Sequence, residues 1–343
     1  MKIVVGVSGG VDSAFAAMSL KDAGNDVIGV HLKIKFKEDN RDTARLEALQ
    51  AITKIQVIQV KCRDVFEKRV ISAFLDAYRC GKTPNPCVIC NETFKLRTLM
   101  EIADSLGADK VASGHYAKIS TYKGVPAIER TDTIKDQTYA LYRLPPEWIS
   151  RLCFPLADIK KPDVKEEIAQ AFHAEGLANG ESQDICFLEG RSLKGYLREK
   201  LMPSELFPGE FVDESGRSLS RHKGLIFYTE GQRKGLGLSC GPWYVKERDF
   251  KTGKLYLSHG IEPKTSIVHF EGASWQQEVT PKHEYDVKVC YRFPPVRAIL
   301  TEFNGTSGTV QLIAPSIGVS VGQSLVFYDG KTLMGGGFIT ESE

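Results

Sequence analysis

A glycine-rich turn near the start of the chain stands between an apolar run and a helical stretch. The apolar run covers residues 3–7, the helical pattern covers 14–23, and the turn reads Ser8-Gly9-Gly10-Val11-Asp12-Ser13. Glycine lets the backbone approach a ligand closely, and the free N–H groups and positive dipole end of a helix N-terminus attract anions. The Gly-Lys-Ser/Thr ending of the P-loop is absent. Two hydroxyls and a carboxylate among the glycines favour a phosphate site over a purely steric turn.

Strand and helix patterns alternate over the first ~200 residues. Strands are predicted at 2–7, 27–33, 55–60 and 110–113, and helices at 12–23, 41–53, 64–78, 91–106 and 162–176. Such alternation predicts a parallel sheet with helices on both faces. Ligands bind such sheets at the carboxyl ends of the strands, where the glycine turn lies. Segments 116–120 and 125–129 predict a hairpin on the rim of this sheet.

The pattern changes after two prolines within residues 201–208. Between Arg217 and Lys254 stand nine basic and three acidic side chains, interleaved with Trp243, Tyr244 and Phe250, in a chain whose net charge is +2. This composition suits a phosphate backbone, and a solvated surface is the alternative. Beyond residue 266 only five or six short strand patterns remain, which predicts a small barrel. We therefore predict domains at 1–203, 204–265 and 266–343, the second small, irregular and basic.

Cysteine usage and the lack of targeting signals bound the cellular context. The chain has no apolar run of about 18 residues and enters a strand directly, which predicts a cytoplasmic protein without a membrane partner. Eight cysteines in such a chain are not expected to form structural disulfides. Only Cys87, Cys90 and Cys186 stand in motif-like, loop-like contexts.

The segment Thr83-Pro84-Asn85-Pro86-Cys87-Val88-Ile89-Cys90-Asn91 holds two of these cysteines. Its prolines predict a rigid turn before the helix at 91–106. Cys90 would then lie near a helix N-terminus, where the dipole lowers the pKa of a thiol and favours the nucleophilic thiolate. A Cys-x-x-Cys pair also suits a redox dithiol or half of a zinc or iron–sulfur site. Cys186, between Ile185 and Phe187, could instead be a small core residue.

Several motifs together carry a family resemblance. The turn at 8–13 resembles the SGGxDS signature of the PP-loop ATP pyrophosphatases, which cleave ATP between the α and β phosphates. With TPNPCxxCN (83–91), GHYA (114–117), KDQTYAL (135–141), SQDICF (182–187), YTEGQRKGLG (228–237) and a terminal barrel, the chain resembles the tRNA-specific 2-thiouridylase family. The resemblance implies a Rossmann-like, parallel-sheet PP-loop domain, a small basic middle domain and a C-terminal β-barrel. It implies ATP-dependent 2-thiolation of the wobble uridine in the anticodon stem-loop of tRNAs for Lys, Glu and Gln.

The resemblance also implies roles for individual residues. ATP, with Mg²⁺ held through its phosphates, would be bound by Gly6, Ser8, Gly9, Gly10, Val11, Asp12, Ser13, Leu32 and Gly114, and Asp12 would assist the metal. Cys90 would be the catalytic nucleophile and Cys186 the persulfide-bearing cysteine. Positions near the target base or tRNA would be Asn85, Pro86, Cys87, His115, Lys135, Asp136, Gln137, Tyr291 and Gln323. The chain departs from the family at Cys290, where Arg is frequent, and at Cys87, where some members have Asp.

The mechanism implied is adenylation of uracil O2, attack by persulfide sulfur from Cys186, and formation of a Cys90–Cys186 disulfide. A cysteine desulfurase or sulfur-relay protein would supply the sulfur. An alternative keeps the substrate but uses an iron–sulfur cluster on Cys87, Cys90 and Cys186. A PP-loop synthetase for a small metabolite and a tRNA-binding module with an inactive nucleotide site are further alternatives. The first would not need the cysteine motifs, and the intact glycine turn argues against the second.

Overall fold

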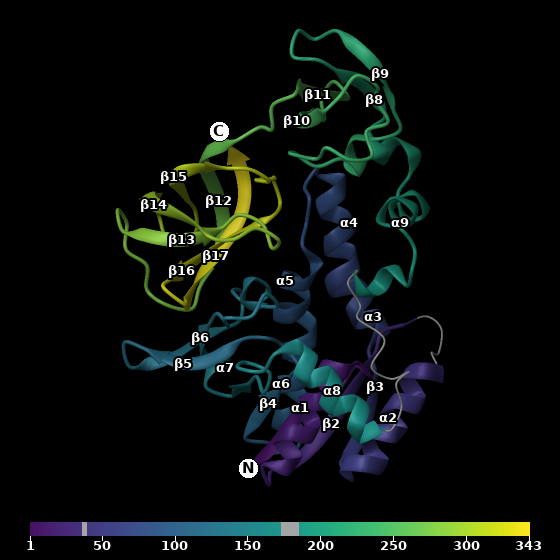
Figure 1. The fold of residues 1–343 in the computed structure, drawn as a ribbon, viewed down its shortest axis with the longest axis vertical. Helices are drawn as coiled ribbons and strands as arrows, with labels where there is room; N and C mark the ends of the chain where they lie inside the picture. The colour runs from purple at the N-terminus through teal and green to yellow at the C-terminus, as the bar shows by residue number, and fades with distance from the viewer. Residues whose placement is uncertain (36–39, 173–184) are drawn as a thin grey trace. The chain divides into compact units, whose positions relative to one another are not determined.

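A five-stranded parallel sheet organises the N-terminal part of the computed structural model, which describes residues 1–35, 40–172 and 185–343. The chain divides into two compact units. The first comprises Met1–Ile71, Pro86–Phe187 and Lys331–Leu333, and the second Ser72–Asn85, Leu188–Gly330 and Met334–Glu343. The sheet belongs to the first unit (Figure 1).

The predicted parallel sheet is confirmed. Its order is β3-β2-β1-β4-β7, and all neighbouring strands run parallel. The strands are β1 (Lys2–Gly6), β2 (Asp26–Lys33), β3 (Gln56–Lys61), β4 (Lys110–Ala112) and β7 (Leu152–Cys153). The glycine turn follows β1, and residues 113–116 follow β4, its hydrogen-bonded neighbour. Both segments therefore emerge at the carboxyl edge of the sheet, where ligands of such sheets bind.

Helices cover both faces of the sheet. On one face lie α1 (Val11–Asp22), α2 (Asn40–Thr53) and α8 (Lys161–Phe172) (Figure 1). They bury Phe15, Leu46 and Ile168 with alternate residues of β1, Ile3 and Val5. The intervening β1 residues point to the other face, where a Cβ on Gly6 would lie 2.8 Å from Leu99 Cδ1 of α6 (Leu96–Ser105). This close packing explains the glycine at the end of β1.

The helix that carries the Cys-x-x-Cys pair begins earlier than predicted. It runs without interruption through α5 (Pro86–Cys90), a π-helical turn η2 (Asn91–Lys95) and α6. Proline is well tolerated in the first turn of a helix because its missing N–H has no partner there, so Pro86 starts the helix. A second π-turn, η1 (Glu67–Ile71), joins α3 (Arg63–Phe66) to α4 (Ser72–Arg79).

The predicted hairpin forms, and its backbone pairing lies outside the parallel sheet. Strands β5 (Lys118–Tyr122) and β6 (Val125–Glu129) are antiparallel, and Glu129 pairs with Thr332 instead of with a strand of the parallel sheet. The sequence analysis did not predict the short elements η3 (Thr138–Ala140) and α7 (Pro146–Ile149) of this unit. It also did not predict η5 (Cys186–Leu188), whose last residue is assigned to the second unit.

The second unit contains a small mixed sheet, so the prediction of an irregular middle segment is wrong. The sheet order is β10-β11-β8-β9, with β11 and β8 parallel. The strands are β8 (Gly209–Val212), β9 (Ser218–His222), β10 (Trp243–Asp249) and β11 (Lys254–His259), and α9 (Leu193–Lys200), η6 (Pro203–Leu206) and η7 (Leu225–Phe227) accompany them. Short strands with charged alternate residues gave little periodic signal.

The predicted C-terminal barrel is confirmed, with six strands. Their order is β12-β15-β14-β13-β16-β17, and pairing of β12 with β17 closes the barrel. The strands are β12 (Thr265–Trp275), β13 (Glu284–Lys288), β14 (Val296–Phe303), β15 (Gly308–Ser316), β16 (Ser324–Asp329) and β17 (Thr332–Ser342). Inside it, Phe327 makes edge-to-face contacts with Phe270, Trp275 and Tyr285.

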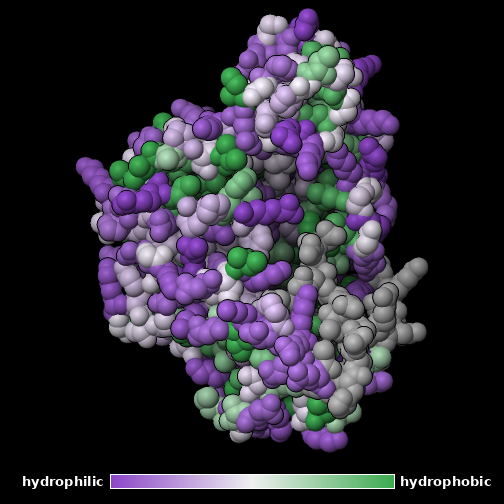
Figure 2. Space-filling view, viewed as in Figure 1, coloured by the Kyte–Doolittle hydropathy of each residue, from purple (hydrophilic) through white to green (hydrophobic). Residues whose placement is uncertain are grey.

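One face of the chain is largely polar. Hydrophilic residues dominate the face shown in Figure 2. Within the described ranges, no helix has both the length and the apolar character needed to cross a membrane.

Candidate active site

The glycine turn is held in shape by the two serines that flank it. The Ser8 N–H donates to Ser13 Oγ at 3.0 Å, and the Ser13 hydroxyl donates to the Gly10 carbonyl at 2.9 Å. The Gly10 N–H donates to Ser8 Oγ at 3.3 Å. Gly9 has φ +78°, a left-handed conformation that favours glycine. These contacts fix a turn at the N-terminus of α1, where backbone N–H groups and the helix dipole favour a phosphate.

A cleft beside this turn contains an arginine that sequence reasoning missed. The cleft is lined by Gly9, Gly10, Val11, Ser13, Ala14, Arg45, Leu46, Leu49 and Ile168. Arg45 projects from α2, and its Nε is buried without a hydrogen-bond partner among the described residues. A buried donor without an acceptor is costly, so this guanidinium is well suited to an anion in the cleft.

Three consecutive residues after β4 connect the glycine turn with other polar groups. A Cβ on Gly114 would lie 2.9 Å from the Asp12 carbonyl carbon and 3.0 Å from Ser13 N, so this position tolerates only glycine without a backbone shift. The Tyr116 hydroxyl donates to Asp12 Oδ1 at 3.0 Å. Asp12, predicted to assist Mg²⁺, is therefore oriented by Tyr116, a residue that the sequence analysis did not single out.

His115, the middle residue of the three, is buried between Ser113 and Lys95. Its Nδ1 lies 2.8 Å from Ser113 Oγ, and its Nε2 lies 3.0 Å from Lys95 Nζ. Burial and the neighbouring Lys95 charge hold the pKa of His115 well below its usual value. A lysine ammonium only donates, so Nε2 accepts from Lys95 and the proton of the neutral ring resides on Nδ1.

The same Lys95 charge acts on the three cysteines that the sequence analysis singled out. Cys87 and Cys186 reach solvent and Cys90 is partly buried, yet the surrounding protein desolvates all three sulfurs. Burial raises the pKa of Cys90 to about 12 and also raises those of Cys87 and Cys186, while the Lys95 charge opposes each rise. A charge on Cys186 further raises the pKa of Cys90. The two thiols, distant in sequence, thus lie within electrostatic reach of one another.

The predicted activation of Cys90 by a helix N-terminus is wrong. The helix begins at Pro86, so Cys90 lies inside helical structure rather than before it. Desolvation exceeds every favourable contribution, including that of Lys95, and the pKa of Cys90 rises instead of falling. At neutral pH the resting residue is therefore a thiol.

An aromatic cluster anchors the Cys186 segment to the Cys90 helix. The buried Phe66 ring makes edge-to-face contacts with Phe94 at 5.1 Å and with Phe187 at 6.0 Å between centroids. Phe94 lies on the π-turn after Cys90, and Phe187 follows Cys186 directly. The other members of the predicted SQDICF motif, 182–184, lie outside the described residues, whereas Ile185 to Phe187 lie inside them.

Comparison with known proteins identifies the family. A family model described as "tRNA methyl transferase HUP domain" matches residues 1–190, a "tRNA methyl transferase PRC-barrel domain" matches 194–259, and an "Aminomethyltransferase beta-barrel domain" matches 266–339. The tRNA-specific 2-thiouridylase MnmA of Nitrosomonas eutropha is 35% identical, with 99% of each chain covered. The chain belongs to the tRNA-specific 2-thiouridylase family.

A second curated relative agrees with this family membership, whereas the solved structure described below is too dissimilar to support or oppose it. The 2-thiouridylase of Thiobacillus denitrificans is 36% identical over 98% of this chain and 99% of its own length. A solved 4-thiouridine synthetase–RNA complex with bound ATP covers 54% of this chain and 44% of its own, with 16% identity and a TM-score of 0.36. The resemblance stated from the sequence motifs is thus confirmed by the close relatives alone.

Two residues predicted to contact tRNA, Asp136 and Gln137, form hydrogen bonds within the first unit. The Gln137 side chain accepts from Tyr116 N–H at 3.1 Å, and Asp136 Oδ1 accepts from Thr131 N–H at 3.2 Å. Both residues lie in the loop that precedes η3, and their hydrogen bonds stabilise this loop. Lys135, the preceding residue, is partly buried. Leu32 is partly buried near the carboxyl end of β2.

Three further predicted positions belong to the second unit. The Gln323 side chain donates to the Thr83 carbonyl at 2.6 Å, so its amide is engaged inside this unit. Tyr291 is exposed on the barrel, with Lys288 Nζ 5.5 Å from its ring centroid. Asn85 ends the segment Ser72–Asn85 of this unit, whereas its predicted partners Pro86, which is buried, and Cys87 belong to the first.

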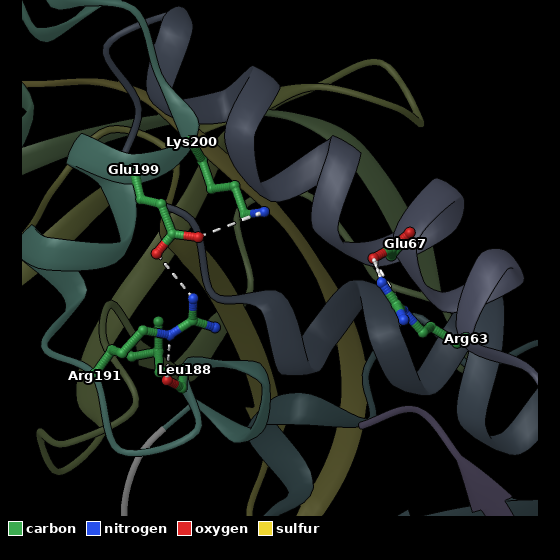
Figure 3. Close-up of polar contacts among 6 residues, drawn as sticks. All are labelled: Arg63, Glu67, Leu188, Arg191, Glu199 and Lys200. Carbon is green, nitrogen blue, oxygen red and sulfur yellow. Dashed lines mark hydrogen bonds and ion pairs between the residues drawn. The ribbon is translucent and has the colours of Figure 1, made fainter. Parts of the chain in front are cut away.

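The basic segment of this 2-thiouridylase divides into paired and unpaired cations. Arg248 is 7% exposed and forms an ion pair with Glu230 at 2.7 Å, so its role is structural. Arg217 and Lys246 pair with Asp213 and Glu214. Six cations form no ion pair with any described residue: Arg221, Lys223, Arg233, Lys234, Lys251 and Lys254. On α9, Glu199 pairs with both Arg191 and Lys200 (Figure 3).

Proposed function

We propose that this protein is an ATP-dependent enzyme that converts the wobble uridine of tRNAs for Lys, Glu and Gln to 2-thiouridine. Family membership makes it a tRNA sulfurtransferase, the class predicted from the motifs. The finer proposal comprises the wobble position, the three tRNAs, the order of steps and a cytoplasmic location. The glycine turn, the three thiols and the unpaired cations support it.

One observation carries the proposal: residues 114–116 join the glycine turn to the thiols. Gly114 packs on the N-terminus of α1, and Tyr116 donates to Asp12. Between them, His115 contacts Lys95, whose charge acts on Cys87, Cys90 and Cys186. Three consecutive residues therefore connect the glycine turn, the proposed phosphate site, with the group of thiols. Activation of a base by ATP and sulfur transfer to that base require this proximity.

The first proposed step makes the uracil oxygen a leaving group. Uracil O2 attacks the α-phosphorus of ATP, the bond to the β-phosphate breaks, and pyrophosphate leaves. The N–H groups of the glycine turn and Arg45 would stabilise the charge on the departing phosphates. Bound Mg²⁺ would supply further charge neutralisation, with the carboxylate of Asp12 as its protein ligand.

The second proposed step transfers sulfur. The terminal sulfur of a Cys186 persulfide attacks C2, and AMP leaves with O2. The thiolate of Cys90 then attacks Sγ of Cys186, which breaks the S–S bond and leaves the terminal sulfur on C2. A Cys90–Cys186 disulfide remains, and a thiol reductant restores it to the dithiol. A sulfur donor such as a cysteine desulfurase or a sulfur-relay protein reloads Cys186.

The iron–sulfur alternative has less structural support. Among the residues that the structure describes, no three His, Cys, Asp or Glu side chains are arranged to hold a metal ion. Cys87, Cys90 and Cys186 would have to move closer together to bind a cluster, and Lys95 acts on all three sulfurs. No step of the proposal therefore uses a cluster. Anaerobic purification tests this alternative: a brown protein whose visible absorption is lost in Cys87→Ser would favour it.

The unpaired cations of the middle segment are proposed to bind the tRNA backbone. Binding of phosphates by lysine and arginine releases counterions, so affinity falls steeply as salt rises. The wobble base must leave the anticodon stack to reach the nucleotide site. The measured quantity is the slope of the logarithm of the tRNA binding constant against the logarithm of the salt concentration. In a double variant with Lys223→Ser and Lys234→Ser, this slope should become shallower by about 1 per lost phosphate contact. In Lys246→Ser it should change less, because Lys246 pairs with Glu214. If the Lys223/Lys234 double variant kept the wild-type slope, this segment would not be the surface that binds the tRNA backbone.

The test of the whole proposal separates ATP use from sulfur transfer. With ATP, tRNA and a persulfide donor, Cys90→Ser and Cys186→Ser should release pyrophosphate but form no 2-thiouridine, measured by nucleoside mass spectrometry. Cys240→Ser, an exposed cysteine of the second unit, serves as the matched control and should retain activity. Full thiolation by Cys186→Ser would refute the persulfide route.

A further inference from the structure

The charge of Lys95 acts on all three cysteine thiols, although no sequence motif singled this residue out. It ends the π-turn η2, which follows Cys90 directly. In a π-helix residue i contacts residue i+5, and such turns are frequent at functional sites. Cys90 and Lys95 are separated by five residues, so the π-turn places both on the same side of the helix, where an α-helical turn would offset them.

The surroundings of Lys95 direct its charge toward sulfur. The groups that face it are Cys87 and Cys90 from α5, Cys186 from η5, and His115 from the segment after β4. His115 is neutral and only accepts from Lys95. The nearest acidic residue in sequence, Glu92, pairs with Arg143 at 2.6 Å. Among the described ion pairs, none joins Lys95 to a carboxylate, so no anion competes with the sulfurs.

We propose that Lys95 is a positioning residue that stabilises the sulfur anions formed during transfer, first the persulfide on Cys186 and then the thiolate of Cys90. The inference rests on the proposed function and adds a role for a residue outside the predicted site. His115, fixed by Ser113, holds the Lys95 ammonium in place through the 3.0 Å contact. The backbone N–H groups of Cys186 and Phe187 also favour an anion on Cys186.

The chemistry needs this help because the site is desolvated. Burial keeps Cys90 protonated at rest, and only a thiolate attacks a disulfide-like sulfur efficiently. The thiol loses its proton to solvent, and the resulting negative charge is balanced by Lys95. When Cys90 forms the disulfide with Cys186, the electron pair of the broken S–S bond passes to the sulfur left on C2, and the thiouracil takes up a proton from solvent. The lysine acts through its charge and exchanges no electrons.

The test measures thiolate formation directly, without tRNA. Alkylation of Cys90 by iodoacetamide between pH 7 and 10, followed by peptide mass spectrometry, reports the thiolate fraction. Lys95→Met should lower the rate at pH 8 about tenfold, the equivalent of one pKa unit, and Lys95→Arg should retain most of it. Lys68→Met is the matched control, because Lys68 is an exposed lysine of the other π-turn. Lys95→Gln replaces Lys95→Met should the latter fail to fold.

Thiolation assays separate failure of this inference from failure of the proposed function. In the supporting result, Lys95→Met and Lys95→Gln release pyrophosphate but form 2-thiouridine at least tenfold more slowly, with the alkylation profile displaced to higher pH. An unchanged alkylation profile overturns the role of Lys95. Wild-type protein that forms no 2-thiouridine with any donor overturns the proposed function, while a displaced profile would still establish the electrostatic role.

Discussion

Lys95 Nζ lies 3.0 Å from His115 Nε2, and burial together with this neighbouring charge keeps the histidine neutral by lowering its pKa. This relationship makes the first unit sensitive to acid. The unfolded chain takes up a proton at His115 near pH 6.5, whereas the folded state does so only at a lower pH. Stability is therefore fully present above pH 6.5 and falls as pH drops from 6.5 toward the lowered folded-state value, by up to about 1.4 kcal/mol per pH unit.

We predict that His115→Gln flattens this dependence. The variant should be less stable than wild type at pH 7.5, because a buried hydrogen-bonded group is replaced, but should lose less stability between pH 6.5 and 5. Urea unfolding in a background with Trp243→Phe and Trp275→Phe would report on the first unit, where Trp148 is then the only tryptophan. His259→Gln, an exposed histidine of the second unit, should leave the slope unchanged. Equal slopes for His115→Gln and wild type would contradict the prediction.

The features that sequence reasoning captured are those with short-range signals. The glycine-rich segment between a strand and a helix pattern predicted the turn, and strand-helix alternation predicted the parallel sheet, because both patterns are visible in short stretches of sequence. The positive φ of Gly9 agrees with the first prediction. β7, with two residues, is too short to give a periodic pattern. The start of the Cys-x-x-Cys helix was misplaced because Pro86 was interpreted as part of a turn rather than as a first-turn residue.

The missed site residues depend on contacts that sequence periodicity does not encode. Lys95 faces Cys90 because a π-turn changes the helical spacing from four to five residues. Arg45 and Tyr116 reach the glycine turn from distant elements, so only the fold brings them there. The raised pKa of Cys90 reflects desolvation by surrounding atoms, which an argument from the helix dipole alone omits.

Arg45 leads to a prediction about nucleotide affinity. Its buried, unpartnered Nε in the cleft beside the glycine turn is expected to donate to a phosphate oxygen. Arg45→Met should weaken ATP binding by at least about tenfold, since a charge-assisted hydrogen bond contributes roughly 1.5–3 kcal/mol, and Arg45→Lys should fall between. Isothermal titration calorimetry measures the effect. Arg63→Met is the control, because Arg63 lies outside the cleft and pairs with Glu67 at the surface (Figure 3). Equal affinities for Arg45→Met and wild type would exclude the contact.

Gly114 leads to a prediction about backbone fit. A methyl group there would lie 2.9 Å from the Asp12 carbonyl carbon, and backbone atoms cannot rotate away as a side chain can. Gly114→Ala should displace the N-terminus of α1 and weaken ATP binding by at least about tenfold, because small misplacements at a phosphate site are costly. Gly195→Ala, at an exposed position of α9, would meet only the Ser192 side chain and should bind ATP normally. Wild-type ATP affinity in Gly114→Ala would show that the turn can adjust.

The aromatic cluster leads to a prediction about coupling between the two thiols. Phe66 is 1% exposed and touches both Phe94, after Cys90, and Phe187, after Cys186. Phe66→Leu removes two edge-to-face contacts, each contributing about 0.5–1.5 kcal/mol, and loosens the Cys186 segment relative to the Cys90 helix. We expect at least threefold slower formation of the Cys90–Cys186 disulfide by diamide, followed by mass spectrometry of unreduced peptides.

A matched change separates this coupling from a general loss of stability. Phe74 is 2% exposed and makes a similar edge-to-face contact with Tyr78, 5.0 Å between centroids, but belongs to the second unit. Phe74→Leu should therefore destabilise the protein without slowing disulfide formation. Equal slowing in both variants would mean that stability alone sets the rate. Unchanged oxidation in Phe66→Leu would mean that the cluster does not position Cys186, and the two sulfurs would then have to be brought together by another part of the chain.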